Sequence, residues 1–261
     1  MLEPWYFNPV IFEIGPVKAH WYGFMYAIAF ILGYIYLQYS KPGKKLNLDE
    51  KQKDLIAIAV ILGILLGGRF GYILFYNLGF YLQNPLKIFA VWEGGMSFHG
   101  GLIGAGIGIL YSIRKNKTKF LPVADIVTSI APLGLFFTRI GNFINGELYG
   151  RIANNFCIHF PTDPANCRYP SQLIQSGLEG LTLFIIIQVV IRKTKTPGIT
   201  SAVFLILYGI FRIIAEFFRE PDPQIGFLPG GITEGQLLST IMVICGIIWC
   251  AILLKKKHHG K

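Results

Sequence analysis

Residues 55–75 read LIAIAVILGILLGGRFGYILF, a run of 21 residues in which Arg69 is the only charged side chain. An α-helix needs about 20 mainly apolar residues to cross the hydrocarbon core of a bilayer. The whole chain of 261 residues has a similar character, with 53% hydrophobic and 15% charged residues. A soluble domain carries about 25% charged residues. The composition therefore excludes an ordinary soluble enzyme and a disordered chain, and it indicates a membrane protein.

Six further stretches qualify as membrane spans or come close. The stretch at 97–113 is short and rich in glycine, and the stretch at 120–143 is the least hydrophobic because it contains Asp125 and Arg139. We therefore predict an all-α polytopic membrane protein, one integral membrane domain over residues 1–261, with about seven transmembrane helices. The expected spans are 21–40, 55–75, 97–113, 120–143, 171–191, 201–218 and 233–254.

Basic residues are distributed unevenly between the loops on the two sides of the membrane. Sixteen Lys and Arg residues lie in the first, third and fifth loops and the C-terminal tail, whereas five lie on the opposite side. The positive-inside rule predicts that the sixteen are cytoplasmic, with the N-terminus outside and the C-terminus inside. The net charge of +10 then reflects topology and contact with anionic lipid headgroups, and no nucleic-acid partner is expected.

Two longer loops are expected on the outer side, at 76–96 and 148–170. The first contains Asn84-Pro85 followed by an apolar stretch, which favours an interfacial amphipathic helix. The second is rich in turn residues and favours a small extracytoplasmic head. It also contains Cys157 and Cys167, which an oxidising compartment could join or leave as free thiols. The cysteine and histidine spacings match no zinc motif, so we expect neither a metal site nor a cofactor.

Ionisable residues inside membrane spans are costly and often mark functional sites. Residues 94–101 read GGMSFHGG and place His99 between glycines, where the loop meets the span. His99 is either a hydrogen-bonded packing residue or an accessible functional one. Gly100, Gly104 and Gly108 recur every four residues, so they predict a smooth helix face for close packing.

A second polar stretch, 138–151, reads TRIGNFINGELYGR. Arg139, Asn142 and Asn145 are spaced by three and share a helix face, and Glu147 and Arg151 follow where glycines allow the chain to turn. These polar groups either satisfy carbonyls at a helix end or form a site for an anion such as a lipid phosphate.

A third set lies on one stripe of a helix, with spacings of four, four and three residues: Tyr208, Arg212, Glu216 and Arg219. Arg212 and Glu216 can form an ion pair across one turn. Two arginines and one glutamate leave the stripe positively charged, so either the pair is purely structural or an anion completes it.

Other polar residues leave alternatives open. Arg69 and Asp125 could pair with each other or with backbone groups, and the role of Glu179 is undecided. Tyr22 is either an interfacial anchor or a residue that contacts lipid.

Four stretches together resemble the bacterial phosphatidylglycerol–prolipoprotein diacylglyceryl transferase family. They occur in the same order as in the family and cover nearly the whole chain: GRFGYILFYN at 68–77, WEGGMSFHGG at 92–101, RIGNFINGE at 139–147 and RIIAEFFREPD at 212–222. The chain departs from the family pattern at Tyr169, Ile174 and Gln175, where the family usually has His, Tyr and Glu, and at Thr138 and Tyr149.

The resemblance implies an enzyme of the bacterial inner membrane that performs the first step of lipoprotein maturation. Such an enzyme moves a diacylglyceryl group from phosphatidylglycerol to the lipobox cysteine thiol of a preprolipoprotein, and it releases glycerol phosphate. The family's functional positions fall on Tyr22, His99, Arg139, Asn142, Glu147, Gly150, Tyr208, Arg212, Glu216 and Arg219.

Chemical reasoning suggests roles for some of these positions. Charge grows on the departing phosphate, so Arg139 and Arg212 are expected to hold it, with Asn142 donating a further hydrogen bond. His99 is the candidate base for the substrate thiol, although an arginine could instead lower the pKa of that thiol. Tyr208 would orient Arg212 or a phosphate oxygen. A lipid transporter and a lipid phosphohydrolase are the rival functions, but the sequence has neither internal repeats nor a recognisable hydrolase nucleophile.

Overall fold

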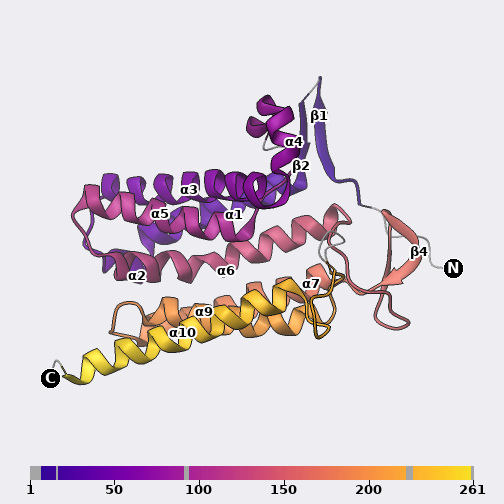
Figure 1. Ribbon diagram of the computed structural model, residues 1–261. Helices are drawn as coiled ribbons and strands as arrows, with labels where there is room; N and C mark the ends of the chain where they lie inside the picture. The colour runs from indigo at the N-terminus through magenta and orange to yellow at the C-terminus, as the bar shows by residue number, and fades with distance from the viewer. Residues whose placement is uncertain (1–6, 16, 91–93, 222–225, 260–261) are drawn as a thin grey trace. The chain divides into compact units, whose positions relative to one another are not determined.

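The computed structural model describes residues 7–15, 17–90, 94–221 and 226–259. Helices dominate this part of the chain (Figure 1). Six of them are long and apolar enough to cross a membrane, and this confirms the prediction of an all-α polytopic membrane protein. The six candidate spans are Trp21–Tyr39, Glu50–Tyr76, Phe120–Ile144, Ser171–Lys193, Ile199–Glu216 and Glu234–Lys256.

The seventh expected span, at 97–113, also forms a helix. It is α5, Phe98–Asn116, which is 19 residues long and begins after Ser97, whose hydroxyl accepts a hydrogen bond from the Gly100 amide. This helix has the length of a span. It is not among the six candidate spans, and it contains several glycines and carries Arg114 and Lys115 in its last turn.

The chain divides into two compact units, residues 1–33 with 127–261 and residues 34–126. The boundaries fall inside α1 (Trp21–Tyr39) and α6 (Phe120–Ile144). Residues 34–126 contain α2 (Lys41–Lys44), α3 (Glu50–Tyr76), α4 (Leu78–Gln83), the 3₁₀ helix η1 (Pro85–Phe89) and α5. Helix α3 begins at a capping box, in which Asp49 and Gln52 each accept a hydrogen bond from the other's amide.

Helices α3 and α5 pack against each other along their glycines. A Cβ atom on Gly104 would lie 1.9 Å from the carbonyl oxygen of Gly63, and one on Gly100 would lie 2.2 Å from that of Gly67. A Cβ on Gly108 would lie 2.2 Å from the carbonyl oxygen of Ala59. The residue numbers fall along α3 as they rise along α5, so the two helices are antiparallel. The predicted glycine face is therefore confirmed as a close helix–helix contact.

The loop at 76–96 is divided between α4 and η1. The apolar stretch after Asn84 forms a 3₁₀ helix of five residues instead of one amphipathic α-helix, and Leu86 and Phe89 on it are exposed. Its place at the membrane interface stays a prediction.

Arg69 holds this loop through backbone carbonyl groups. Its guanidinium donates to the oxygens of Ile88 at 3.0 Å, Ala90 at 3.1 Å and Gly95 at 3.2 Å. Of the two partners that the sequence left open for Arg69, the backbone is the one that the structure supports.

The other unit contains most of the remaining helices. They are α7 (Ser171–Gln175), the π-helix η3 (Ser176–Thr182), α8 (Leu183–Lys193), α9 (Ile199–Glu216) and α10 (Glu234–His259). Leu183, Ile187, Phe204 and Tyr208 form a buried hydrophobic cluster within it. Glycines again allow close packing, since a Cβ on Gly209 of α9 would lie 2.8 Å from the Ser239 carbonyl oxygen of α10.

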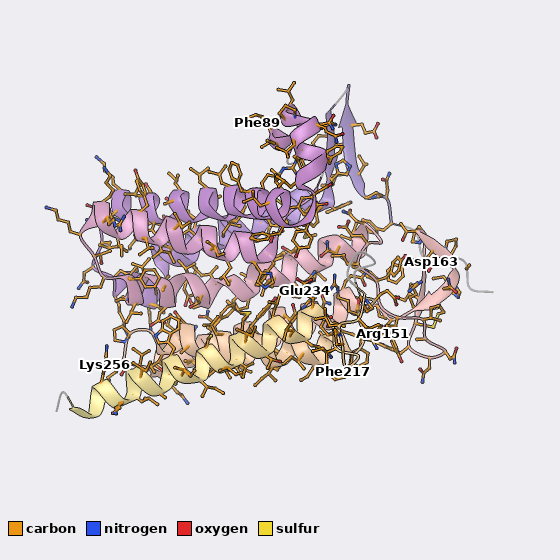
Figure 2. All side chains as sticks on the ribbon, in the orientation of Figure 1. Phe89, Arg151, Asp163, Phe217, Glu234 and Lys256 are labelled. Atoms are coloured by element: carbon orange, nitrogen blue, oxygen red, sulfur yellow. A yellow bond between two sulfur atoms is a disulfide. The ribbon has the colours of Figure 1, made fainter. Side chains whose placement is uncertain are left out.

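This unit also contains two hairpins. The first, β1 (Val10–Ile14) with β2 (Val17–His20), was not expected from the sequence. The second lies in the loop at 148–170 and pairs β3 (Ile158–Phe160) with β4 (Asp163–Arg168). A disulfide joins Cys157 to Cys167, so of the two alternatives for these cysteines the structure supports the bond. Asp163, labelled in Figure 2, pairs with Arg168 of the same strand. The extracytoplasmic position of this hairpin stays a prediction.

Candidate functional site

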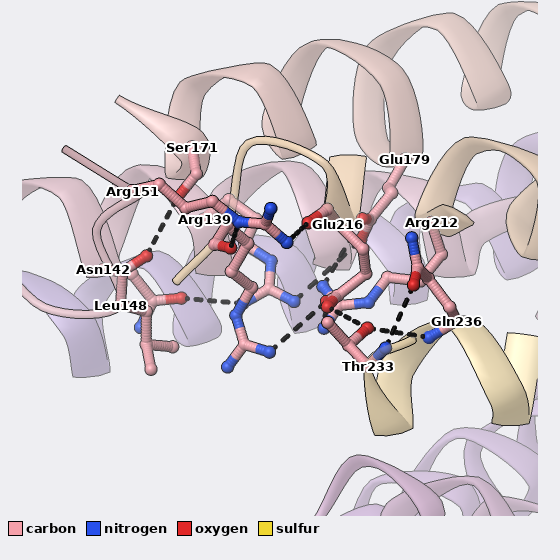
Figure 3. Close-up of polar contacts among 11 residues, drawn as sticks. Arg139, Asn142, Leu148, Arg151, Ser171, Glu179, Arg212, Glu216, Thr233 and Gln236 are labelled. Atoms are coloured by element: carbon pink, nitrogen blue, oxygen red, sulfur yellow. Dashed lines mark hydrogen bonds and ion pairs between the residues drawn. The ribbon is translucent and has the colours of Figure 1, made fainter. Parts of the chain in front are cut away.

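A buried group of ion pairs lies between α6, η3 and α9 (Figure 3). We call it the arginine cluster, and it consists of Arg139, Glu179, Arg212, Glu216 and Arg219. Arg139 Nη2 lies 3.9 Å from one carboxylate oxygen of Glu179, and Arg212 Nη1 lies 3.5 Å from the other. The two arginines that the sequence singled out, on different helices, therefore meet at one carboxylate.

Glu179 is completely buried and belongs to the π-helix η3. π-helical turns are rare and often occur at functional sites. The segment is held tightly against α6, because a Cβ on Gly180 would lie 2.7 Å from the Phe136 Cα atom. Ser176 also donates to the Phe136 carbonyl oxygen at 3.3 Å. These contacts fix the position from which Glu179 reaches the two arginines.

Glu216 is the second carboxylate of the cluster and is also completely buried. One of its oxygens lies 2.6 Å from Arg212 Nη2 and 3.3 Å from Arg219 Nη1, and the other accepts a hydrogen bond from the Thr233 hydroxyl at 2.7 Å. A small pocket opens beside this carboxylate, and Arg219, Thr233 and Gly235 lie in its wall. The predicted ion pair across one turn of α9 is confirmed.

Amide side chains extend the cluster from Arg139 toward the loop after α6. Arg139 Nη1 donates to the Asn142 side-chain oxygen at 3.3 Å, and the Asn142 amide donates to Glu147 Oε1 at 2.8 Å. Asn145 donates to the same Glu147 oxygen at 3.3 Å. Asn142 and Asn145, which share a helix face with Arg139, therefore both donate to the Glu147 carboxylate. Gln172 supports this arrangement by donating to the Glu147 carbonyl oxygen at 2.7 Å.

Gly150 and Arg151 tie the same loop to the end of α9. Gly150 pairs with Arg219 in a β-bridge, and a Cβ on Gly150 would lie 2.4 Å from the Phe218 carbonyl oxygen. Arg151 donates to the carbonyl oxygens of Arg219 at 3.0 Å and Glu216 at 3.2 Å. Gly150 thus acts through the backbone, by allowing the loop to approach the helix end.

Two tyrosines complete the set on this unit. Tyr208 lies one turn before Arg212 on α9, is buried, and stacks on Phe204 with ring centroids 5.7 Å apart. Tyr22 packs against α6, where a Cβ on Gly141 would lie 3.1 Å from its ring, and its hydroxyl lies 3.2 Å from that of Tyr26. Tyr22 therefore lies against the helix that carries Arg139.

His99 lies in the other unit, where it is the second residue of α5. Its ring meets Phe98 edge to face, with centroids 5.5 Å apart. The structure therefore brings together Tyr22 and the site residues of α6, the following loop and α9, and a role for His99 in the same site stays a prediction.

The charges of the arginine cluster do not cancel. Three guanidinium groups face two carboxylates, so the formal net charge is +1. Several of its buried polar atoms have no hydrogen-bond partner among the described residues: Arg139 Nε, Arg212 Nη1 and both carboxylate oxygens of Glu179. Unpaired polar atoms and uncompensated charge are costly in a buried site. Such an arrangement is suited to binding a small anion.

Glu179 is the site residue that sequence reasoning left undecided. A carboxylate within an apolar span was the available signal. Its partners could not be read from spacing, because Arg139 and Arg212 are distant in the chain and the π-helix shifts the face that Glu179 presents. Gln172, which holds the Glu147 backbone, was likewise not singled out.

The fold and the cluster define a polytopic membrane protein with a positively charged site buried between its helices. Residues 9–252 match the family model described as prolipoprotein diacylglyceryl transferase. The chain belongs to this family, and it is a membrane transferase of lipoprotein biosynthesis.

Several relatives carry the name phosphatidylglycerol–prolipoprotein diacylglyceryl transferase. The protein of Azospirillum brasilense is 50% identical over 92% of each chain. The protein of Geobacter sulfurreducens is 44% identical over 96% of each chain. The protein of Yersinia enterocolitica is 46% identical over 93% of this chain and 92% of its own length.

Proposed function

We propose that this chain transfers the diacylglyceryl group of phosphatidylglycerol to the lipobox cysteine thiol of a preprolipoprotein, forming a thioether and releasing glycerol phosphate. Membership of the family supports the reaction. The observation that carries the site assignment is the meeting of Arg139 and Arg212 at the Glu179 carboxylate. Two cations from separate helices that approach the same carboxylate support the assignment of a shared phosphate site.

The reaction creates negative charge at the phosphate. The bond between the glyceryl carbon and the phosphate oxygen breaks, with its electron pair going to the oxygen, while the substrate sulfur bonds to the carbon. A phosphodiester of charge −1 thereby becomes a phosphomonoester of charge approaching −2. Cations fixed in a buried site stabilise charge that develops in the transition state. We assign this role to Arg139 and Arg212, with Asn142 beside Arg139 as a further donor.

The substrate thiol must lose its proton before or during the attack. A thiol has a pKa of about 8.5, and histidine has an unperturbed pKa near 6.5. We assign His99 as the group that accepts this proton. The imidazolium that forms then loses the proton to the solvent, which restores the neutral ring for the next turnover. Tyr208, buried one turn from Arg212, is assigned the orientation of that guanidinium.

The remaining site residues are assigned to substrate binding: Tyr22, Glu147, Gly150, Glu216 and Arg219. Arg139 lies near the end of α6, and Arg212 lies near the end of α9. With the N-terminus outside and the C-terminus cytoplasmic, these helix ends face the outer leaflet of the inner membrane. Phosphatidylglycerol would then enter the site from that leaflet, together with the substrate peptide.

One assay tests the proposal and separates it from its rivals. The purified protein is mixed with labelled phosphatidylglycerol and a peptide that contains a lipobox cysteine, and the peptide mass is measured. Transfer adds the mass of the diacylglyceryl group to the cysteine. An unmodified peptide with lipid moved between leaflets would indicate a transporter, and free diacylglycerol would indicate a phosphohydrolase. Either result would refute the proposal.

A further inference from the structure

Glu179 contributes a negative charge to a site whose proposed ligand is an anion. A site built only to bind phosphate would be expected to present arginines without a carboxylate between them. Glu179 instead lies within 4 Å of both candidate phosphate-binding side chains, at 3.9 Å from Arg139 and 3.5 Å from Arg212. Its effect on the charge of the site therefore needs a physical explanation.

The contacts of Glu179 are looser than those of the other carboxylate in the cluster. Glu216 approaches Arg212 to 2.6 Å and accepts a hydrogen bond from Thr233, whereas neither Glu179 oxygen has a hydrogen-bond partner among the described residues. Arg212 Nη1 and Arg139 Nε are similarly left without one. Glu179 thus offsets the charge of the two arginines through ion pairs of 3.5 and 3.9 Å, without a hydrogen bond to either guanidinium.

The net charge of +1 matches the phosphodiester reactant better than the phosphomonoester product. A phosphodiester carries one negative charge and would neutralise the cluster, whereas a phosphomonoester approaches a charge of −2 above its second pKa near 6. Without Glu179 the net charge would be +2, and the product would then be the better match. A site that binds its product too strongly is slow to release it, and product release limits the rate of many enzymes.

We propose that Glu179 sets the charge of the arginine cluster so that it holds a phosphodiester headgroup and releases the phosphomonoester product. Glu179 is in this view a positioning residue, which acts through Arg139 and Arg212. The inference rests on the proposed function, because the identity of the two anions follows from the reaction.

The first test uses the unaltered protein and two inhibitors that differ by one charge. Glycerol phosphate and its methyl ester are each titrated at pH 8 into the transferase assay. We expect the singly charged ester to inhibit at a lower concentration than the doubly charged product. Stronger inhibition by glycerol phosphate would overturn the proposal. A positively charged site whose charge Glu179 did not limit would bind the doubly charged anion more tightly than the singly charged ester. A protein that modified no peptide at all would instead refute the proposed function.

The second test removes the charge of Glu179. In Glu179→Gln we expect glycerol phosphate to bind at least about tenfold more tightly, because a unit charge a few ångströms away is removed from a buried site. Direct titration calorimetry of the purified variant measures this binding even if its turnover is low. Glu179→Asp keeps the charge and should change the affinity for glycerol phosphate little.

The exposed Glu50→Gln is the matched control for the loss of a carboxylate. Unchanged affinity for glycerol phosphate in Glu179→Gln, or an equal increase in Glu179→Asp, would overturn the inference.

Discussion

Arg212 and Glu216, one turn apart on α9, form the shortest ion pair of the arginine cluster, with Nη2 and Oε1 separated by 2.6 Å. The other terminal nitrogen of Arg212 faces Glu179 at 3.5 Å without a hydrogen bond. One side of the guanidinium is therefore fixed by its own helix, and the other side makes a longer ion pair with the carboxylate of η3.

Replacing either of the two arginines assigned to the phosphate should strongly lower the rate of diacylglyceryl transfer. We expect Arg139→Ala and Arg212→Ala each to lower the rate on the order of 100-fold or more, because a fixed donor to the developing charge is lost. The rate is measured at equal protein abundance with the labelled lipid and the lipobox peptide. Arg192→Ala, at an exposed position near the end of α8, is the control and should remain near normal. Near-normal transfer by both cluster variants would contradict the assignment.

The role of His99 can be tested through the dependence of the rate on pH. If His99 accepts the thiol proton, the rate of the unaltered enzyme should rise with pH as the imidazole becomes neutral. His99→Gln should be slower and should lose this rise. A His99→Gln enzyme that is slower but retains the original pH profile would show that the histidine positions a substrate.

Glu216 should matter for stability as well as activity. Glu216→Gln leaves Arg212 and Arg219 without their shared carboxylate in a buried site. Removing one partner of a buried ion pair typically costs about 3–5 kcal/mol, so we expect a clearly lower unfolding temperature in detergent micelles. The exposed Glu50→Gln should melt like the unaltered protein. Equal melting of the two variants would mean that this ion pair does not support the fold.

The glycine contact between α3 and α5 offers a test with an internal control. Gly104→Ala would place a Cβ atom 1.9 Å from the Gly63 carbonyl oxygen, so the helices must separate and the unfolding temperature should fall. Gly106, on the same helix, has nothing within 4 Å of an added Cβ atom. Gly106→Ala should therefore be neutral or stabilise the helix by up to about 1 kcal/mol. Similar melting of both variants would contradict the close contact.

Much of the helical architecture follows from local pattern. The run at 55–75 predicted α3 because an apolar stretch of that length has few other stable solutions in a bilayer. The four-residue spacing from Gly100 to Gly108 predicted the packed face of α5, since that spacing aligns residues on a helix. The hairpin β1–β2 was missed because its strands are only five and four residues long.

The site was predictable where its members are neighbours in sequence. Arg212, Glu216 and Arg219 are three or four residues apart on one helix, so their contacts follow from helical geometry. The contact between Arg139 and Glu179 joins two helices that are distant in the chain. It depends on a π-helical turn and on the close approach of Gly180 to Phe136, neither of which has a periodic signature in the sequence.

The Cys157–Cys167 bond in the hairpin after α6 has a consequence for membrane insertion. Disulfides persist in oxidising compartments and are rare in the reducing cytosol. The bond therefore supports placing this loop, and the adjoining end of α6, on the non-cytoplasmic side, independently of the lysine and arginine distribution. A molecule inserted upside down would retain two alkylatable sulfhydryls there, so a membrane-permeant thiol reagent would modify Cys157 and Cys167 only in inverted copies, whereas Cys245 and Cys250 are free in both orientations.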